Sequence, residues 1–240
     1  MKKILCLDFD GVICDSQAEC LLVSYNAYNI FKKSSFESIN SIKQIPEQVS
    51  IGFFKYRYLV RPASEYWQLM YLLIDNNIIM TQENFDTLVH KNESILIEFE
   101  PFFFSERNRL IRNYTELWYN LHSPFHEFIN YMDKLINQYE LFIVTNKDQF
   151  SVSALLEYFN IPISRNRIWG KEKNSSKINK IEIIAKFENT SKDHIIFIDD
   201  HPDYVDLMLK SGIESFLATW GYNQSKHKHS ISDFEFLLSN

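Results

Sequence analysis

The pattern of hydrophobic and polar positions divides the chain into two kinds of region. A short apolar run at residues 3–8 ends at a carboxylate, as expected of a buried strand in a parallel sheet. Between about residues 16 and 122, apolar residues recur at three- and four-residue spacing, and no segment shows the alternation typical of a half-buried strand. We expect helices at residues 18–31, 64–76, 82–97 and 105–121. This part of the chain is therefore predicted to be helical throughout.

From about residue 124 onwards, strand-like and helix-like segments alternate. We expect strands at residues 140–145, 168–169, 194–199 and 213–217. We expect helices at residues 124–138, 150–159, 177–187 and 203–210. Such repetition predicts a parallel sheet covered by helices on both faces. The predicted fold class is α/β, with a doubly wound parallel-sheet core of residues 1–16 and 124–240 and an inserted all-helical domain of residues 17–123.

Composition and charge narrow the class of protein. Of the 240 residues, 45% are hydrophobic and 23% are charged, as in ordinary globular proteins. The net charge of −6 gives no general attraction to nucleic acid or to an anionic membrane, so we expect neither as a partner. Three clustered cysteines, Cys6, Cys14 and Cys20, are an odd set that favours reduced thiols over a disulfide framework. No apolar run suits a signal peptide or a membrane span, so we expect a cytoplasmic protein, of unknown oligomeric state.

Polar residues follow three of the predicted strands. They are Asp8 and Asp10 after the first strand, Thr145 and Asn146 at the end of the second, and Asp199 and Asp200 at the end of the third. Ligands bind at the carboxyl ends of strands in open α/β sheets, so these side chains are candidates for one site. Four carboxylates held close together raise one another's pKa and destabilise the fold. A divalent cation would remove that conflict, and hard carboxylate oxygens in this number favour Mg²⁺.

These residues resemble the motifs of the haloacid dehalogenase-like (HAD) hydrolase superfamily. The segment Asp-Phe-Asp-Gly-Val-Ile-Cys-Asp-Ser at residues 8–16 resembles its first motif, DxDGxxxDS. Thr145-Asn146-Lys147 is similar to the second motif, a lysine ahead of the next-to-last strand to the third, and Asp199-Asp200 to the acidic fourth. The helical insertion lies where the family carries its helical, C1-type cap. The segment at residues 144–156 looks most like the phosphoglycolate phosphatase and β-phosphoglucomutase branch.

The resemblance implies phosphoryl transfer through an aspartyl-phosphate. Asp8 would be the nucleophile, and Asp10 would first protonate the leaving alcohol and then activate water. Thr145 and Asn146 would bind phosphate oxygens, and the lysine would neutralise charge. Mg²⁺ would be held by Asp8, Asp10, Asp199 and Asp200, with Asp10 contributing its backbone carbonyl. The presence of Asp10 also favours phosphate chemistry, since the dehalogenases of the superfamily lack this second aspartate.

Three assignments have alternatives at this level. Lys177 stands at a helix start after two serines and is favoured over Lys173 as the lysine of the third motif. The second acid of the fourth motif is Asp199 or Asp203, and Asp199 is favoured because paired acids occur among relatives. Arg61, in an Arg-Pro pair between predicted helices, is the candidate for binding a further anionic group of the substrate.

The predicted function is that of a Mg²⁺-dependent phosphatase acting on a small phosphorylated metabolite. The cap would close over the site, exclude water and select the leaving group. A phosphomutase acting on a sugar phosphate would share every core residue, so only the product would distinguish it. A non-catalytic HAD-fold binding protein is the rival from another class. A degenerate fold would be expected to lose Asp8 or Asp10 first, and this chain has both.

Overall fold

The computed structural model describes residues 2–33, 35–76, 81–173, 175–224 and 226–238. Its contacts divide the chain into two compact units. The first unit contains Met1–Asp15 and Ser123–Asn240, and the second contains Ser16–His122. The second unit is therefore inserted into the first between Asp15 and Ser123. None of the helices in the described ranges is both long enough and apolar enough to cross a membrane.

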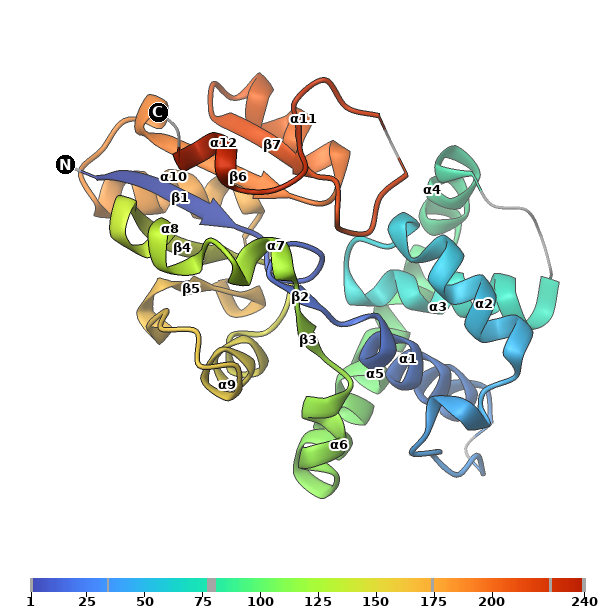
Figure 1. The fold of residues 1–240 in the computed structure, drawn as a ribbon. Helices are drawn as coiled ribbons and strands as arrows, with labels where there is room; N and C mark the ends of the chain where they lie inside the picture. The colour runs from blue at the N-terminus through green and yellow to red at the C-terminus, as the bar shows by residue number, and fades with distance from the viewer. Residues whose placement is uncertain (1, 34, 77–80, 174, 225, 239–240) are drawn as a thin grey trace. The chain divides into compact units, whose positions relative to one another are not determined.

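A parallel sheet forms the centre of the first unit (Figure 1). Its strands among the described residues are β1 (Lys3–Leu7), β4 (Tyr139–Val144), β5 (Ile168–Trp169), β6 (Ile195–Asp199), β7 (Glu214–Ala218) and β8 (Ser230–Ile231). They lie in the order β5-β4-β1-β6-β7-β8, and every neighbouring pair is parallel. In this register, Leu5 of β1 lies opposite Leu141 of β4 and Ile196 of β6. The central strand is buried on both faces, which explains its continuous apolar sequence.

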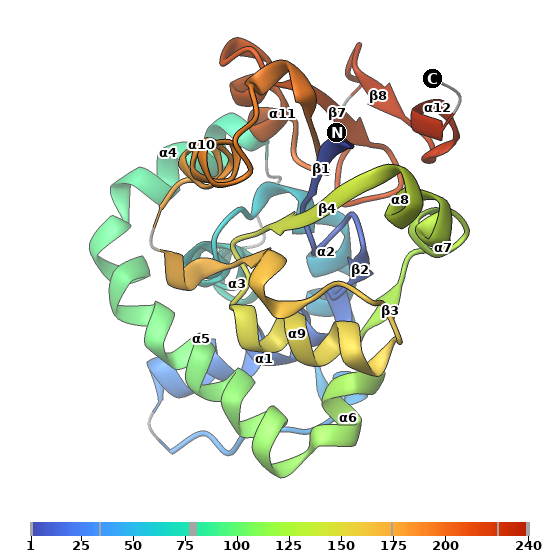
Figure 2. The same ribbon diagram turned by 90° about the vertical axis from the view of Figure 1, so that its left-hand side faces the viewer.

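Helices cover both faces of the sheet (Figure 2). They are α7 (His126–Ile129), α8 (Met132–Gln138), α9 (Gln149–Tyr158), α10 (Lys177–Phe187), α11 (Pro202–Lys210) and α12 (Glu235–Leu238). On one face, Ile181 and Ile184 of α10 and Met208 of α11 share a buried cluster with Phe142 and Phe197 of the sheet. Helices α7, α8 and α12 lie on the other face. The predicted doubly wound α/β core is confirmed.

A short ribbon stands where the chain passes between the units. Strand β2 (Cys14–Asp15) pairs antiparallel with β3 (Ser123–Pro124). Cys14 lies opposite Pro124, and Asp15 lies opposite Ser123. Both chain crossings between the two units therefore run directly through this pair of strands.

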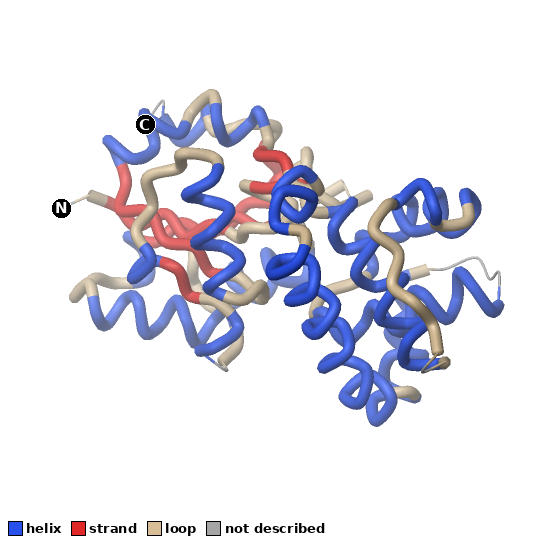
Figure 3. Tube along the Cα trace, turned by 90° about the horizontal axis from the view of Figure 1, so that it is seen from below, coloured by secondary structure: helices blue, strands red, loops and turns tan. Residues whose placement is uncertain are grey.

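The second unit is helical, and its described residues contain no strand (Figure 3). Its helices are α1 (Gln17–Lys32), α2 (Glu47–Tyr56), α3 (Tyr66–Tyr71), α4 (Gln82–Lys91), α5 (Glu93–Asn113) and α6 (Thr115–Asn120). A π-helical turn at Leu72–Asn76 continues α3. Aromatic rings fill much of its interior, where Tyr66 stacks between Phe53 and Phe103 with ring centroids 5.8 and 5.1 Å away.

Several predicted helix boundaries were wrong. The segment at 82–97 is two helices, because Asn92 leaves helical geometry and its side chain donates a hydrogen bond to Gln68 at 2.8 Å. Helix α5 then continues past Pro101 to Asn113, although a helix was expected to start only at 105. The segment at 124–138 begins as strand β3 and contains two short helices. Helix α2 was not predicted, and the expected helix at 64–76 starts instead as a 3-10 turn at Ala63–Glu65.

Candidate active site

The order of the strands in the sheet brings together three strand ends that carry polar side chains. Strands β4, β1 and β6 are neighbours, so Thr145, Asp8 and Asp199 lie at one edge of the sheet. Asp200 follows directly. All four side chains are buried, with residue exposures of 0–7%. One carboxylate oxygen from each of Asp8, Asp199 and Asp200 lies within 4.8 Å of the others. We call these three residues the carboxylate cluster.

The turn after β1 allows the chain to pass close to this cluster. The carbonyl oxygen of Phe9 accepts hydrogen bonds from the backbone N–H groups of Ile13 and Cys14, both at 2.9 Å. Gly11 has φ +85°, and a Cβ atom there would lie 2.2 Å from Oδ2 of Asp200. Both the backbone conformation and the close approach therefore require glycine at this position.

Lys177 joins two members of the carboxylate cluster. It is the first residue of α10, whose N-cap, Ser176, accepts a hydrogen bond from the backbone N–H of Asn179 at 3.3 Å. Its Nζ lies 2.8 Å from Asp8 Oδ2 and 2.6 Å from Asp199 Oδ2. Burial alone would lower the pKa of Lys177, but the two carboxylates raise it above its ordinary value. The ammonium group is therefore charged at neutral pH.

Lys173, the alternative lysine, has different surroundings. It ends a 3-10 turn, and its Nζ lies 4.8 Å from the centre of the Trp169 ring. Lys177, and not Lys173, is therefore the lysine that contacts Asp8 and Asp199.

The segment after β4 supplies hydroxyl, amide and ammonium groups. Thr145 Oγ1 accepts a hydrogen bond from the backbone N–H of Lys147 at 3.1 Å. The side chain of Asn146 donates to the hydroxyl of Tyr204 at 3.0 Å. Lys147 is buried, and its Nζ lies 3.2 and 3.5 Å from the two carboxylate oxygens of Asp10. Lys147 was not predicted to have a role of its own, although its place directly after Thr145 and Asn146 was a usable signal.

Two further residues beside the site were missed. Lys180 is 1% exposed, and its Nζ donates to the backbone carbonyl of Thr145 at 2.8 Å. Burial and the nearby Lys177 lower the pKa of Lys180 to about 8. The ring of Tyr204 lies 4.3 Å from Lys177 Nζ, a cation–π contact. The three-residue spacing from Lys177 to Lys180 on one helix was the available signal for the second lysine.

Two other candidates lie in different surroundings. The side chain of Asp203 is 56% exposed, and this residue is not part of the carboxylate cluster, whereas Asp199 is. Arg61 belongs to the helical unit, where its guanidinium group makes two hydrogen bonds to the carboxylate of Asp86 at 2.8 and 3.1 Å. A role for Arg61 in substrate binding would require this ion pair to open or to be shared.

The donor set fits a divalent cation. Asp8, Asp10, Asp199 and Asp200 carry four acidic groups, and Lys147 and Lys177, which contact three of them, supply two positive charges. Burial raises the pKa of Asp199, and the Lys177 ammonium group counteracts this rise. The excess negative charge, the burial and the hard oxygen ligands together suit Mg²⁺. Such an ion would be held by the carboxylate cluster.

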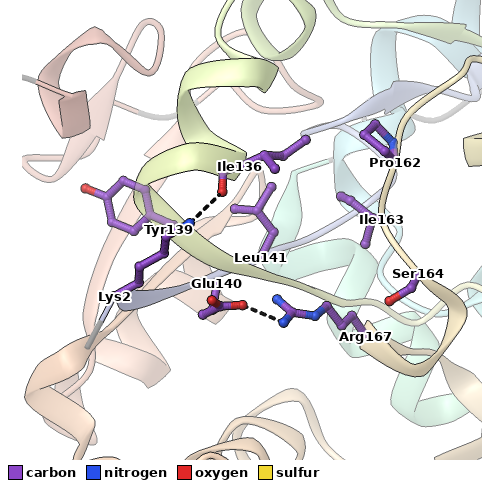
Figure 4. Close-up of a pocket in the computed structure, with 9 residues that line it drawn as sticks. All are labelled: Lys2, Ile136, Tyr139, Glu140, Leu141, Pro162, Ile163, Ser164 and Arg167. Atoms are coloured by element: carbon purple, nitrogen blue, oxygen red, sulfur yellow. Dashed lines mark hydrogen bonds and ion pairs between the residues drawn. The ribbon is translucent and has the colours of Figure 1, made fainter.

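A separate pocket of about 240 Å³ lies at the opposite edge of the sheet (Figure 4). Its lining includes Lys2, just before β1, and Tyr139 and Glu140 at the beginning of β4. Glu140 forms an ion pair with Arg167 across the pocket wall. Because ligands of such sheets bind at the carboxyl ends of the strands, this pocket is not part of the candidate active site.

No family model and no curated protein matches the sequence. Solved structures match over nearly the whole chain. A HAD-like family hydrolase from Streptococcus pneumoniae is 16% identical, with a TM-score of 0.60, and the match covers 99% of this chain and 97% of that chain. A HAD-superfamily hydrolase of subfamily IA from Geobacter sulfurreducens is 12% identical, with a TM-score of 0.59 and coverage of 99% and 95%. This chain therefore has the fold of the HAD-like hydrolases, and the resemblance seen in its motifs is confirmed at the level of the fold.

A third similar structure has a name that matches the branch whose motifs this chain resembles. It is a protein from Haemophilus somnus, named a predicted phosphoglycolate phosphatase. It is 15% identical to this chain, with a TM-score of 0.64, and the match covers 99% of this chain and 97% of that chain.

Proposed function

We propose that this protein is a Mg²⁺-dependent phosphatase that hydrolyses a small phosphorylated metabolite through an aspartyl-phosphate at Asp8. One observation carries the proposal: Lys177 contacts both Asp8 and Asp199 inside a buried cluster of three carboxylates at the carboxyl edge of the sheet. Burying like charges in this way costs stability, and that cost is understandable where the charges perform chemistry.

Asp8 is held in a defined orientation for nucleophilic attack. Its Oδ1 accepts the backbone N–H of Phe9 at 2.8 Å, and its Oδ2 contacts Lys177. In the first step, a carboxylate oxygen of Asp8 forms a bond to phosphorus while the bond from phosphorus to the leaving alcohol oxygen breaks. Asp10 enters this step in its protonated form and transfers its proton to that oxygen as it leaves.

The second step returns the enzyme to its starting state. Asp10, now a carboxylate, accepts a proton from a water molecule that attacks phosphorus. The bond from phosphorus to Asp8 then breaks, and inorganic phosphate is released. Thr145 and Asn146 bind phosphate oxygens, and Lys177 offsets negative charge on the phosphoryl group and on Asp8. Asp8, Asp199 and Asp200, with the backbone carbonyl of Asp10, would hold Mg²⁺, which would supply further positive charge to the phosphoryl oxygens.

The helical unit serves as a cap in this proposal. It is inserted directly after the segment that carries Asp8 and Asp10, and it is joined to the core through the β2–β3 ribbon. A cap that closes over the site would exclude bulk water and admit small substrates in preference to proteins. Substrate selection would then depend on residues of this unit, with Arg61 as the first candidate.

The test is phosphate release from a panel of small phosphorylated metabolites, with and without Mg²⁺. We expect Mg²⁺-dependent release that falls by about three orders of magnitude or more in Asp8→Asn, because the nucleophile is lost. Asp203→Asn is the matched control, since it makes the same change at an exposed acid outside the cluster, and it should retain activity. Conversion of a sugar phosphate to its isomer without phosphate release would identify a phosphomutase. Equal inactivity of all three proteins would favour a binding role.

A further inference from the structure

Tyr222 connects the carboxylate cluster to the linker between the two units. It follows β7, and its backbone N–H donates to Oδ2 of Asp200 at 2.7 Å. Its phenol hydroxyl lies 3.0 Å from Oδ1 of Asp15 and 3.3 Å from the carbonyl oxygen of Cys14. Tyr222 is 8% exposed. One buried residue thus contacts both a proposed metal ligand and strand β2.

The residues just before Tyr222 hold the same segment in place. The indole N–H of Trp220 donates to the carbonyl oxygen of Val12 at 3.1 Å. Gly221 lies so close to its neighbours that a Cβ atom there would be 2.3 Å from Cβ of Asp200 and 2.3 Å from the carbonyl oxygen of Gly11. Because the packing leaves no space here, the backbone of residues 220–222 cannot shift independently of Asp200 and of the turn after β1.

The other end of this connection is the ribbon through which the chain passes between the units. Asp15 is the last residue of the first unit before the helical insertion, and it pairs with Ser123, the residue at which the chain returns to that unit. The backbone N–H of Phe125 also donates to the carbonyl oxygen of Ile13 at 2.9 Å. Tyr222 therefore anchors the ribbon at the position where a cap would pivot.

We infer that Tyr222 couples divalent-cation binding at the carboxylate cluster to the order of the β2–β3 ribbon. The inference rests on the metal site of the proposed function. Asp200 fixed in a coordinating geometry would hold the Tyr222 backbone, which would in turn hold the phenol against Asp15. Coupling of this kind is reciprocal, so a firm contact between Tyr222 and Asp15 also favours cation binding. Tyr222 is thus a positioning residue, through which cation binding at the metal site changes the order of the β2–β3 ribbon.

The test measures backbone amide exchange of residues 13–15, Ser123 and Phe125, with and without Mg²⁺, together with the affinity for Mg²⁺ by calorimetry. Tyr222→Phe removes only the hydroxyl. Tyr139→Phe is the matched control, because it removes a hydroxyl from an equally buried tyrosine that donates to Leu237 at the opposite edge of the sheet. In the wild type and the control, we expect Mg²⁺ to slow ribbon exchange about fivefold or more. In Tyr222→Phe, this slowing should be lost, and the Kd for Mg²⁺ should rise about fivefold.

The outcomes separate this inference from the proposed function. If the wild type binds no Mg²⁺, the metal site itself is refuted. If Tyr222→Phe keeps both the affinity and the slowing of exchange, the metal site stands and the coupling is overturned. Asp15→Ala removes the other side of the contact, and it decides the question should Tyr222→Phe fail to fold. The double variant should be no worse than either single one, and additive losses would overturn the coupling.

Discussion

Lys177→Met should destabilise the protein strongly in the absence of a divalent cation and much less in its presence. The substitution keeps most of the side-chain volume but removes the charge that contacts Asp8 at 2.8 Å and Asp199 at 2.6 Å. Oxygens of these two carboxylates lie within 4.8 Å of one another, and at an effective dielectric constant of about 20 their repulsion is about 3–4 kcal/mol. Loss of one partner from a buried ion pair typically costs about 3–5 kcal/mol, which agrees with this figure.

Mg²⁺ should recover most of that loss, because it supplies positive charge to the same oxygens. A ligand that binds only the folded state adds about 2.7 kcal/mol of stability at 100 times its Kd. The assay is urea unfolding, with and without Mg²⁺, of the wild type, Lys177→Met and Arg107→Met. Arg107→Met is the matched control: Arg107 contacts Glu19 at 2.7 and 3.0 Å in the helical unit, and this pair is also buried.

Without Mg²⁺, both variants should lose several kcal/mol of unfolding free energy. With Mg²⁺, the loss should shrink in Lys177→Met and stay constant in Arg107→Met. The reasoning would be refuted by a Lys177→Met protein as stable as the wild type without Mg²⁺. It would also be refuted by an equal recovery of Arg107→Met, because Mg²⁺ would then stabilise the chain without reference to the carboxylate cluster.

Two buried titratable groups predict opposite dependences of stability on pH. Burial raises the pKa of Glu65 from 4.5 to about 7. The unfolding free energy should therefore fall by about 3 kcal/mol at most as pH rises from 4.5 to 7. In urea titrations, Glu65→Gln should remove this dependence of the unfolding free energy on pH. Burial, together with Lys177, lowers the pKa of Lys180 from 10.5 to about 8. Between pH 8 and 10.5 the unfolded chain therefore binds more protons than the folded chain does. The unfolding free energy should rise with pH across this range. Lys180→Met should flatten the rise, and an unchanged slope in either variant would contradict the corresponding assignment.

The strands of the core could be predicted because their physical signal is local. Strands β1, β4 and β6 are mostly apolar and buried, and each ends at, or one residue before, a polar residue of the candidate site. Knowing that they are parallel is enough to bring Asp8, Thr145 and Asp199 to one edge, since the carboxyl ends of parallel strands coincide. The order of the strands in the sheet follows only from the structure, because the apolar runs are too similar to specify their neighbours.

The residues that sequence reasoning missed depend on contacts between distant segments. Tyr222 meets Asp15 from more than 200 positions away, and Tyr204 meets Asn146 across the same edge of the sheet. Nothing in the local pattern around either tyrosine distinguishes it from an ordinary buried aromatic residue. The helical unit shows the same limit: the break at Asn92 depends on a side-chain hydrogen bond to Gln68, which periodicity cannot reveal.

In the first unit, the buried apolar residues and the buried charged residues lie in different places. The buried cluster formed by β1, β4, β6, α10 and α11 contains no Asp, Glu, Lys, Arg or His residue. Yet Asp8, Asp199, Lys177 and Lys180 are each no more than 7% exposed, and all lie around one edge. Buried charged residues usually stabilise a protein less than apolar residues of the same size. The stability of the fold therefore does not explain why these charged residues are concentrated at one place. Because charged groups are buried together at this single edge and apolar residues fill the strands that lead to it, we place the proposed active site at this edge.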